Sequence, residues 1–178
     1  MPSYPMLAQY LAVVPAGSGE SGFAPQIIPY LTDIWLREYF ARVRKCDVVE
    51  VPIDRFTYLF DIEPGRLIAA WGVSRGKHSA PRPASRMKGH PKGGGADTHR
   101  GHAIAHTLGG GTDINLVPQL GSVNVGAFRV LEKEAVATPG ALYFTHFIYR
   151  GARDQRASWV EQGLLVPGRA PKVTLHGN

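Results

Sequence analysis

Cysteine is almost absent from this sequence of 178 residues, because Cys46 is the only one. No disulfide within the chain and no cysteine-based zinc site can therefore form. No apolar run approaches the roughly 18 residues that a membrane span needs, so we expect no membrane partner. The apolar stretch 7–14 follows no basic segment and ends without a cleavage pattern, so no signal peptide is seen. The expected location is therefore outside the cell, if a specialised bacterial system secretes or delivers the protein, and otherwise the cytoplasm.

Acidic residues are scarce relative to basic ones. The chain has 14 Asp and Glu against 20 Lys and Arg, which gives a formal net charge of +6. A basic surface raises the local concentration of polyanions, so the charge favours nucleic acid or anionic lipid as a partner. Many basic proteins bind neither, so charge alone does not assign a function.

The sequence is rich in turn residues, with 21 Gly and 14 Pro, and this predicts short elements. After a loop at 15–25, apolar residues at three- and four-residue steps predict a helix that follows Pro29, with Thr32 or Asp33 as its cap. A second helix is expected at 124–137, with Asn124 as its N-cap. Strands are predicted at 48–51, 56–60, 66–73, 99–108, 141–149 and 172–175.

The connections between these elements include one long polar stretch. Residues 74–98 form a basic loop, 109–111 a turn and 115–119 an irregular connector. The expected fold is α+β with an antiparallel sheet, and the sequence, which shows no internal repeat and no second domain, predicts a single domain, residues 1–178. Within it, residues 1–47 are expected to form an N-terminal extension with a packing helix, and 48–178 the core.

The segment from Arg100 to Glu132 contains the groups that phosphodiester hydrolysis requires. The reaction needs a base for water, a divalent ion and positive charge at the phosphate. On a strand, Arg100 and His102 share one face, so a guanidinium and a neutral imidazole can meet the same phosphate. Asn124 at the start of the next helix offers an amide oxygen, and Glu132 lies two turns later on about the same side. Mg²⁺ prefers such oxygen ligands and keeps much of its own water.

This ordered set resembles the DNA/RNA non-specific endonucleases of the ββα-metal superfamily. Their motif reads approximately D-R-G-H, N-L-V-P-Q, N-x-G and L-E. The matching residues here are Arg100-Gly101-His102-Ala103-Ile104-Ala105, Gly109-Gly110, Asp113, Asn115-Leu116-Val117-Pro118-Gln119, Asn124, Gly126 and Leu131-Glu132. A weaker likeness extends upstream to residues 58–61 and 65–66. The resemblance implies a ββα-metal finger at about 66–138, embedded in the mixed domain.

The resemblance also implies a role for each matching position. His102 would be the general base, Asn124 the sole direct protein ligand of a hydrated Mg²⁺, with Mn²⁺ as a possible substitute, and Glu132 the carboxylate that positions water. Arg100 would stabilise transition-state charge, and Asn115 would support the site. The expected substrate is DNA, with RNA as a further candidate.

The substrate-binding residues are less well defined by the pattern. The family uses an arginine upstream of the motif on the phosphate, for which Arg66, Arg82 and Arg86 are candidates. Lys88 in the basic loop and His106, four residues after His102, are further candidates for substrate contact. His99 stands where the family usually has Asp, so either His99 itself or Asp97 must brace the site.

Three other interpretations remain open at this stage. A zinc protease reading of His102-x-x-x-His106 needs a helix and a Glu after the first His, whereas Ala103 stands there. A His-Asn-His-type nuclease would bind zinc or nickel through a second histidine, such as His106 or His146. A non-catalytic nucleic-acid-binding module would use only the basic loop, with salt-sensitive binding and no cleavage. If the chain is a nuclease, an antibacterial toxin or effector with a cognate immunity protein is the expected biological role, and a scavenging or defence nuclease is the alternative.

Overall fold

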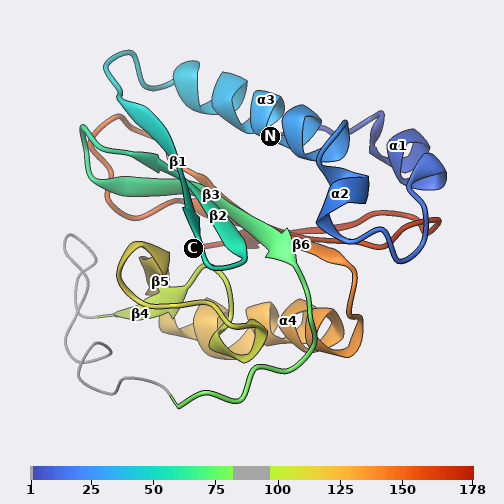
Figure 1. Cartoon of the computed structure of the whole chain (residues 1–178). Helices are drawn as coiled ribbons and strands as arrows, with labels where there is room; N and C mark the ends of the chain where they lie inside the picture. The colour runs from blue at the N-terminus through green and yellow to red at the C-terminus, as the bar shows by residue number, and fades with distance from the viewer. Residues whose placement is uncertain (1, 82–96) are drawn as a thin grey trace.

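The computed structural model describes residues 2–81 and 97–178 of the chain (Figure 1). The helices are α1 (Leu7–Val13), α2 (Glu20–Phe23), α3 (Ile27–Phe40) and α4 (Phe128–Ala137). The strands are β1 (Val48–Ile53), β2 (Phe56–Asp61), β3 (Arg66–Val73), β4 (Thr98–His102), β5 (Leu116–Leu120), β6 (Leu142–Ile148), β7 (Trp159–Leu165) and β8 (Lys172–Gly177). Shorter elements are 3₁₀ turns at His106–Leu108 and Asp113–Asn115 and a π-helical turn at Val123–Ala127.

In this described part of the chain, a six-stranded sheet has the order β1-β2-β3-β6-β7-β8, and β4 pairs separately with β5. Neighbouring strands are antiparallel throughout. Figure 1 shows α3 on one side of the large sheet and the β4, β5 and α4 unit on the other. The predicted α+β fold with an antiparallel sheet is therefore confirmed, although strand β7 was not predicted.

Helix α3 covers one face of the sheet with an apolar stripe. The buried residues recur every four positions, at Ile27, Leu31, Trp35 and Tyr39. The Trp35 ring lies 5.7 Å from that of Trp71 on β3 and 5.1 Å from that of Phe144 on β6, measured between ring centroids. Aromatic rings at these separations add to the free energy gained by burying their area.

The predicted start of α3 was wrong. The helix begins at Ile27, so Pro29 lies in its first turn, where a missing N–H leaves no helical hydrogen bond unmade. Thr32 is inside the helix, and its hydroxyl donates to the Ile28 carbonyl at 3.0 Å rather than capping. The predicted loop at 15–25 likewise contains α2, whose Phe23 is buried.

The opposite face of the sheet supports α4. Phe128, Leu131 and Ala135 of α4 are buried at helical spacing. The helix is also fixed by polar contacts: the Ser74 hydroxyl donates to the Ala135 carbonyl at 2.7 Å, and the Gln162 amide donates to the Phe128 carbonyl at 3.3 Å. These two hydrogen bonds fix the position of α4 against the end of β3 and against β7.

The hairpin of β4 and β5 corrects two predictions. The strand expected at 99–108 ends at His102, and residues 106–108 form a 3₁₀ turn instead. The connector expected at 115–119 is strand β5, which pairs with β4 from Thr98↔Leu120 to His102↔Leu116. The Ala103 amide donates to the Asn115 carbonyl at 2.8 Å and closes this pairing.

None of the helices in the described ranges has the length and apolarity that crossing a bilayer requires.

Candidate active site

A pocket of about 420 Å³ lies between β4, the 3₁₀ turn that follows it, and α4. It brings together four of the residues singled out in the sequence. Arg100 and His102 line it from β4, Asn124 from the π-helical turn and Glu132 from α4. Further lining residues are Lys77, Ala105, His106, Thr107, Arg129, Lys133 and Val136. The pocket is therefore built mainly from β4, the residues that follow it, the π-helical turn and α4.

Strand geometry places Arg100 and His102 on the same side of β4. Side chains two apart on a strand point to one face, and both of these side chains are half-buried. The residue between them, Gly101, faces the other way, where the buried Gln119 side chain crosses beneath it. A Cβ at position 101 would lie 2.0 Å from the Gln119 Oε1. The R-G-H sequence therefore alternates two site residues with a glycine that the packing requires.

Asn124 does not cap a helix, contrary to the prediction. Helical structure begins at residue 121, and Asn124 lies in the π-helical turn Val123–Ala127. In a straight α-helix, eight steps of about 100° would leave Asn124 and Glu132 about 80° apart. A π-turn holds one extra residue, so the separation of eight acts as about seven, which is two α-helical turns. The irregular turn thus explains how both side chains reach the same pocket.

A buried tyrosine lies behind Glu132. Tyr143 of β6 is fully buried, and its hydroxyl accepts a hydrogen bond of 2.6 Å from the Gln162 amide. Burial and the nearby charge of Glu132 raise the pKa of Tyr143 well above its usual value. The Tyr143 hydroxyl therefore stays protonated, and the wall beneath Glu132 contributes no negative charge.

Asn115 supports the pocket from behind and is completely buried. Its Oδ1 accepts from the Ile104 amide at 2.7 Å, and its Nδ2 donates to the carbonyls of Ile104 and Gly111, both at 2.9 Å. These bonds hold the chain that turns away from His102. Asn115 does not line the pocket, so its contribution is to position the segment that follows the imidazole.

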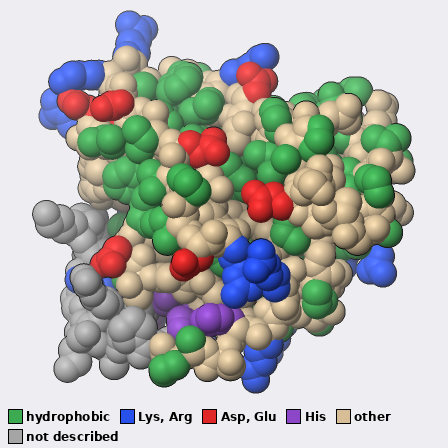
Figure 2. Space-filling view, in the orientation of Figure 1, with side chains coloured by type: hydrophobic (Ala, Val, Ile, Leu, Met, Phe, Trp, Pro, Cys, Tyr) green, Lys and Arg blue, Asp and Glu red, His purple; other side chains and the backbone are tan. Residues whose placement is uncertain are grey.

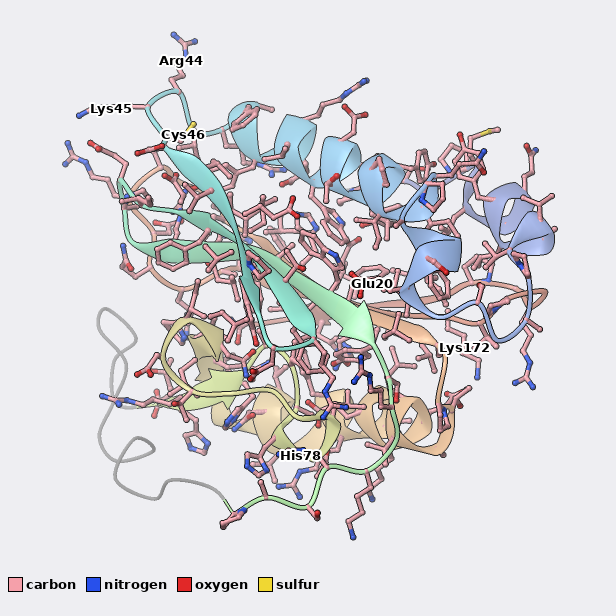
Figure 3. The ribbon with its side chains drawn as sticks, viewed as in Figure 1. Glu20, Arg44, Lys45, Cys46, His78 and Lys172 are labelled. Carbon is pink, nitrogen blue, oxygen red and sulfur yellow. The ribbon has the colours of Figure 1, made fainter. Side chains whose placement is uncertain are left out.

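The rings of three histidines lie side by side at the pocket, in the order His102, His106 and His78. The His102 and His106 ring centroids are 6.3 Å apart, and those of His106 and His78 are 5.8 Å apart. His78, labelled in Figure 3, belongs to the segment after β3, and its amide donates to the Thr107 carbonyl at 2.7 Å. Figure 2 shows a patch of histidine side chains on this face, with Lys and Arg side chains beside it. His106 is thus placed beside His102, as a substrate-contacting residue would have to be.

Arg66 is not part of the pocket, although its sequence position suggested a phosphate contact. It is 3% exposed, and its guanidinium lies over the rings of Tyr39 and Tyr149, 5.1 and 4.1 Å from their centroids. It donates to the Tyr39 hydroxyl at 2.8 Å, to the Gly151 carbonyl at 3.1 Å and to the Asp154 carbonyl at 2.5 Å. Arg66 is a packing residue on the far side of β5.

The remaining candidates for substrate contact from the basic loop were Arg82, Arg86 and Lys88. All three lie outside the described residues. His99, at the position where the family usually has Asp, is exposed, and its ring packs against Gly121. Asp97 is also exposed. Neither of these two residues lines the pocket.

Two of the alternative readings are affected by this geometry. His146 is completely buried on the α3 side of the sheet, where its Nδ1 lies 3.0 Å from the Glu161 Oε2 and its ring stacks on Trp35. It therefore cannot act as a metal ligand in the pocket, and burial lowers its pKa. The zinc protease reading fails because His102 is on a strand and His106 on a 3₁₀ turn, not on one helix.

Sequence reasoning missed three basic residues of the pocket. Arg129 and Lys133 are one turn apart on α4, and Lys77 comes from the segment after β3. All three are exposed. Helical spacing contains the signal for the first two, because positions 129, 132, 133 and 136 share one helix face. Lys77 gives no such signal, since only the tertiary structure brings its segment to the pocket.

The donor atoms in the pocket fit a magnesium ion better than zinc. Asn124 and Glu132 offer oxygen atoms on one wall. In the ranges 2–81 and 97–178, no three His, Cys, Asp or Glu side chains are grouped as metal ligands. A site with so few protein ligands suits Mg²⁺, which retains several waters. The residues present therefore fit a hydrated ion held by Asn124, with Glu132 beside it.

Comparison with known proteins gives a consistent picture. Residues 73–158 match the model of a family described as DNA/RNA non-specific endonuclease. The match spans β4, β5 and α4 and therefore the whole pocket. No curated protein matches the sequence.

Among solved structures, the chain is similar to NucA from Streptococcus agalactiae. The metal-free form has a TM-score of 0.53 and 14% identity, over 81% of this chain and 88% of that one. The form with a magnesium ion bound has a TM-score of 0.53 and 12% identity, over 80% of this chain and 89% of that one. These values show a common fold, so the predicted fold is confirmed.

Proposed function

We propose that this chain, whose residues 73–158 match the model of the DNA/RNA non-specific endonuclease family, is a magnesium-dependent nuclease with His102 as its general base. It would hydrolyse phosphodiester bonds in DNA and RNA without reading the base sequence. One observation carries the proposal. An imidazole and a guanidinium from β4, an amide oxygen from the π-helical turn and a carboxylate from α4 line a single pocket.

The proposed reaction begins with a water molecule next to His102. The neutral imidazole removes a proton as the water oxygen bonds to phosphorus and the ester P–O bond on the opposite side breaks. Arg100, two residues away on the same face of β4, pairs with the phosphate oxygens as negative charge develops on them. Both groups come from one short strand, so their separation changes little during the reaction.

The other wall of the pocket would hold the metal ion. Asn124 would supply the direct protein ligand, and the Glu132 carboxylate would accept hydrogen bonds from ordered water. When bound, the magnesium ion supplies positive charge to the phosphate and to the leaving oxygen. Magnesium is favoured by the oxygen donors here and by the related NucA fold, of which a magnesium-bound form is known. Mn²⁺ has similar ligand preferences and is expected to substitute.

The substrate range follows from what the pocket offers. Lys77, Arg129 and Lys133 surround it with positive charge, which attracts phosphates of any sequence. The chemistry acts on the phosphate, so both DNA and RNA are expected substrates unless a residue reads the 2′-hydroxyl.

A metal-dependence assay tests this function directly. Purified protein is expected to degrade plasmid DNA, single-stranded DNA and RNA in Mg²⁺, and to lose this activity in EDTA. Cleavage that persists after complete chelation contradicts the proposal. Salt-sensitive binding without cleavage in Mg²⁺, Mn²⁺, Zn²⁺ or Ni²⁺ would favour the non-catalytic binding module instead.

We further propose that the nuclease serves as an antibacterial toxin or effector, delivered by a specialised bacterial system. The exposed cations at the pocket would suit an acidic immunity protein that covers it. Expression of the wild-type chain in the bacterial cytoplasm without an inhibitor is expected to arrest growth, whereas His102→Ala is expected to be tolerated. Normal growth with active, soluble wild-type protein would count against a toxic role.

A further inference from the structure

We propose that the loop between β6 and β7 forms a second nucleic-acid-binding surface, which contacts phosphates away from the bond that is cleaved. This loop, residues 150–158, is termed the arginine loop here. The inference rests on the proposed nuclease function, because it assigns a further part of the same substrate to a different surface. It concerns residues that neither the motif nor the pocket includes.

The arginine loop has an unbalanced positive charge. It contains Arg150, Arg153 and Arg156 against one carboxylate, that of Asp154. The Asp154 Oδ2 accepts a 2.8 Å hydrogen bond from the Gly151 amide. Within the described residues, no carboxylate forms an ion pair with Arg153 or Arg156. Such a cluster of arginines is an electrostatic site for a polyanion.

Arg153 and Arg156 also line an open pocket at the surface. A pocket of about 440 Å³ is formed by Arg153, Asp154, Gln155, Arg156, Ser158 and Asn178. Arg153 is exposed and Arg156 half-buried. Two guanidinium groups with a neighbouring hydroxyl are the groups that commonly bind phosphate oxygens.

The loop is held in place by buried contacts. Arg66, which the sequence suggested as a phosphate ligand, donates instead to the backbone carbonyls of Gly151 and Asp154. The Gln155 amide donates to the Pro64 carbonyl at 2.8 Å, and the Arg150 guanidinium lies 4.6 Å from the centroid of the Trp159 ring. A fixed loop loses less conformational entropy when it binds than a flexible one.

The arginine loop is joined to the catalytic hairpin by Asn178. The Asn178 Nδ2 donates to the Ala157 carbonyl at 3.0 Å and to the Pro118 carbonyl at 3.2 Å. Its Oδ1 accepts from the Leu120 amide at 2.8 Å. Pro118 pairs with Arg100 across the hairpin, so β5 alone separates Asn178 from the strand that carries Arg100.

This connection places the second surface within reach of one substrate molecule. Two strand spacings of about 4.8 Å put Asn178 roughly 10 Å from β4. In Figure 1 the loop after β6 lies on the same side of the molecule as β4, β5 and the C-terminal residue. A duplex of 30 base pairs, at about 3.4 Å per step, extends well beyond that distance on either side of the cleaved bond.

The test measures binding of a 30-base-pair duplex in EDTA, where no cleavage occurs, across a series of salt concentrations. The double variant Arg153→Ala/Arg156→Ala is expected to weaken binding by roughly tenfold or more. The slope of log affinity against log salt should fall by about two, because two phosphate contacts are lost. Arg153→Lys/Arg156→Lys keeps both charges and should retain most of the slope. The thermal midpoint of each variant confirms that it is folded.

A matched control removes two other exposed arginines. Arg44→Ala/Arg169→Ala changes the net charge equally and is expected to leave the salt slope at the wild-type value. If the arginine-loop variant has the same duplex affinity and the same salt slope as this control, the proposal is wrong. Cleavage by the wild type in Mg²⁺ is measured separately. If the arginine-loop variant has a reduced salt slope but the wild type cleaves no substrate, the binding surface is supported and the nuclease function is wrong.

Discussion

Replacing His102 with alanine is expected to reduce DNA cleavage by about a hundredfold to ten-thousandfold, the range that general base catalysis typically contributes. The other histidines near the pocket are not expected to take over its role. His106 follows on a different element, with its ring centroid 6.3 Å from that of His102, and His99 is exposed and does not line the pocket. Plasmid nicking under saturating Mg²⁺ measures the effect.

The His102 variant should fold normally, which makes the loss of activity interpretable. The side chain is half-buried at the edge of a pocket, so truncation leaves no closed cavity in the core. Circular dichroism and the thermal midpoint should match the wild type. Duplex binding in EDTA should also be retained, because the cations Arg100, Lys77, Arg129 and Lys133 remain.

Chemical rescue separates a base from a structural residue at this position. Free imidazole in the buffer can enter the space left by alanine and accept the proton, so activity should rise with imidazole concentration. The rescue should require the neutral form of imidazole and so increase as the pH rises through about 7. A folded His102→Ala protein that cleaves at the wild-type rate would overturn the assignment of the base.

The parts of the fold that the sequence predicted are those with local causes. The strands β1, β2 and β3 follow from runs of β-branched and aromatic residues bounded by turn residues. Strand β7 escaped prediction because Glu161 and Gln162 interrupt its apolar pattern. Both side chains are buried, and their partners come from distant segments: Tyr4 and His146 for Glu161, and Tyr143 and His176 for Gln162. A local sequence pattern cannot predict such distant partners.

In the candidate site, too, the features with local causes were predicted and those that depend on tertiary contacts were not. The pairing of Arg100 with His102 required only the two-residue period of a strand, and the structure has both side chains in the pocket. Asn124 was placed correctly at the pocket but for the wrong reason, since a local N-cap was predicted and a π-helical turn is found. Arg66 was misplaced because an arginine is normally exposed, whereas two tyrosines and two backbone carbonyls bury this one. The catalytic roles themselves stay predictions until they are measured.

Replacing Asn124 with alanine is expected to lower activity by on the order of a hundredfold at moderate Mg²⁺, because the proposed direct ligand is lost. The defect should shrink as Mg²⁺ increases, since a weakened site can still be filled by mass action. The half-saturating Mg²⁺ concentration for cleavage is the quantity to compare. Direct Mn²⁺ binding, followed by electron paramagnetic resonance without substrate, gives a readout that does not depend on catalysis.

Asn124→Asp provides the matched control. It keeps an oxygen at the same position and adds a negative charge, so it should bind Mn²⁺ at least as tightly as the wild type. Because Asn124 lies in the π-helical turn, a general disturbance of that turn would affect both variants alike. A difference between alanine and aspartate therefore reports on the ligand and not on the helix.

A comparison of Asn124→Ala with His106→Ala distinguishes the magnesium site from a histidine-bound metal. If His106 held the ion, as in a His-Asn-His-type nuclease, His106→Ala and not Asn124→Ala would raise the half-saturating metal concentration, and zinc or nickel would support cleavage better than magnesium. With Asn124 as the ligand, His106→Ala should leave Mn²⁺ affinity unchanged and alter only the interaction with substrate. An Asn124→Ala protein with wild-type Mn²⁺ affinity and wild-type cleavage would exclude the oxygen-ligand site, because no other part of the proposal places a metal ion in this pocket.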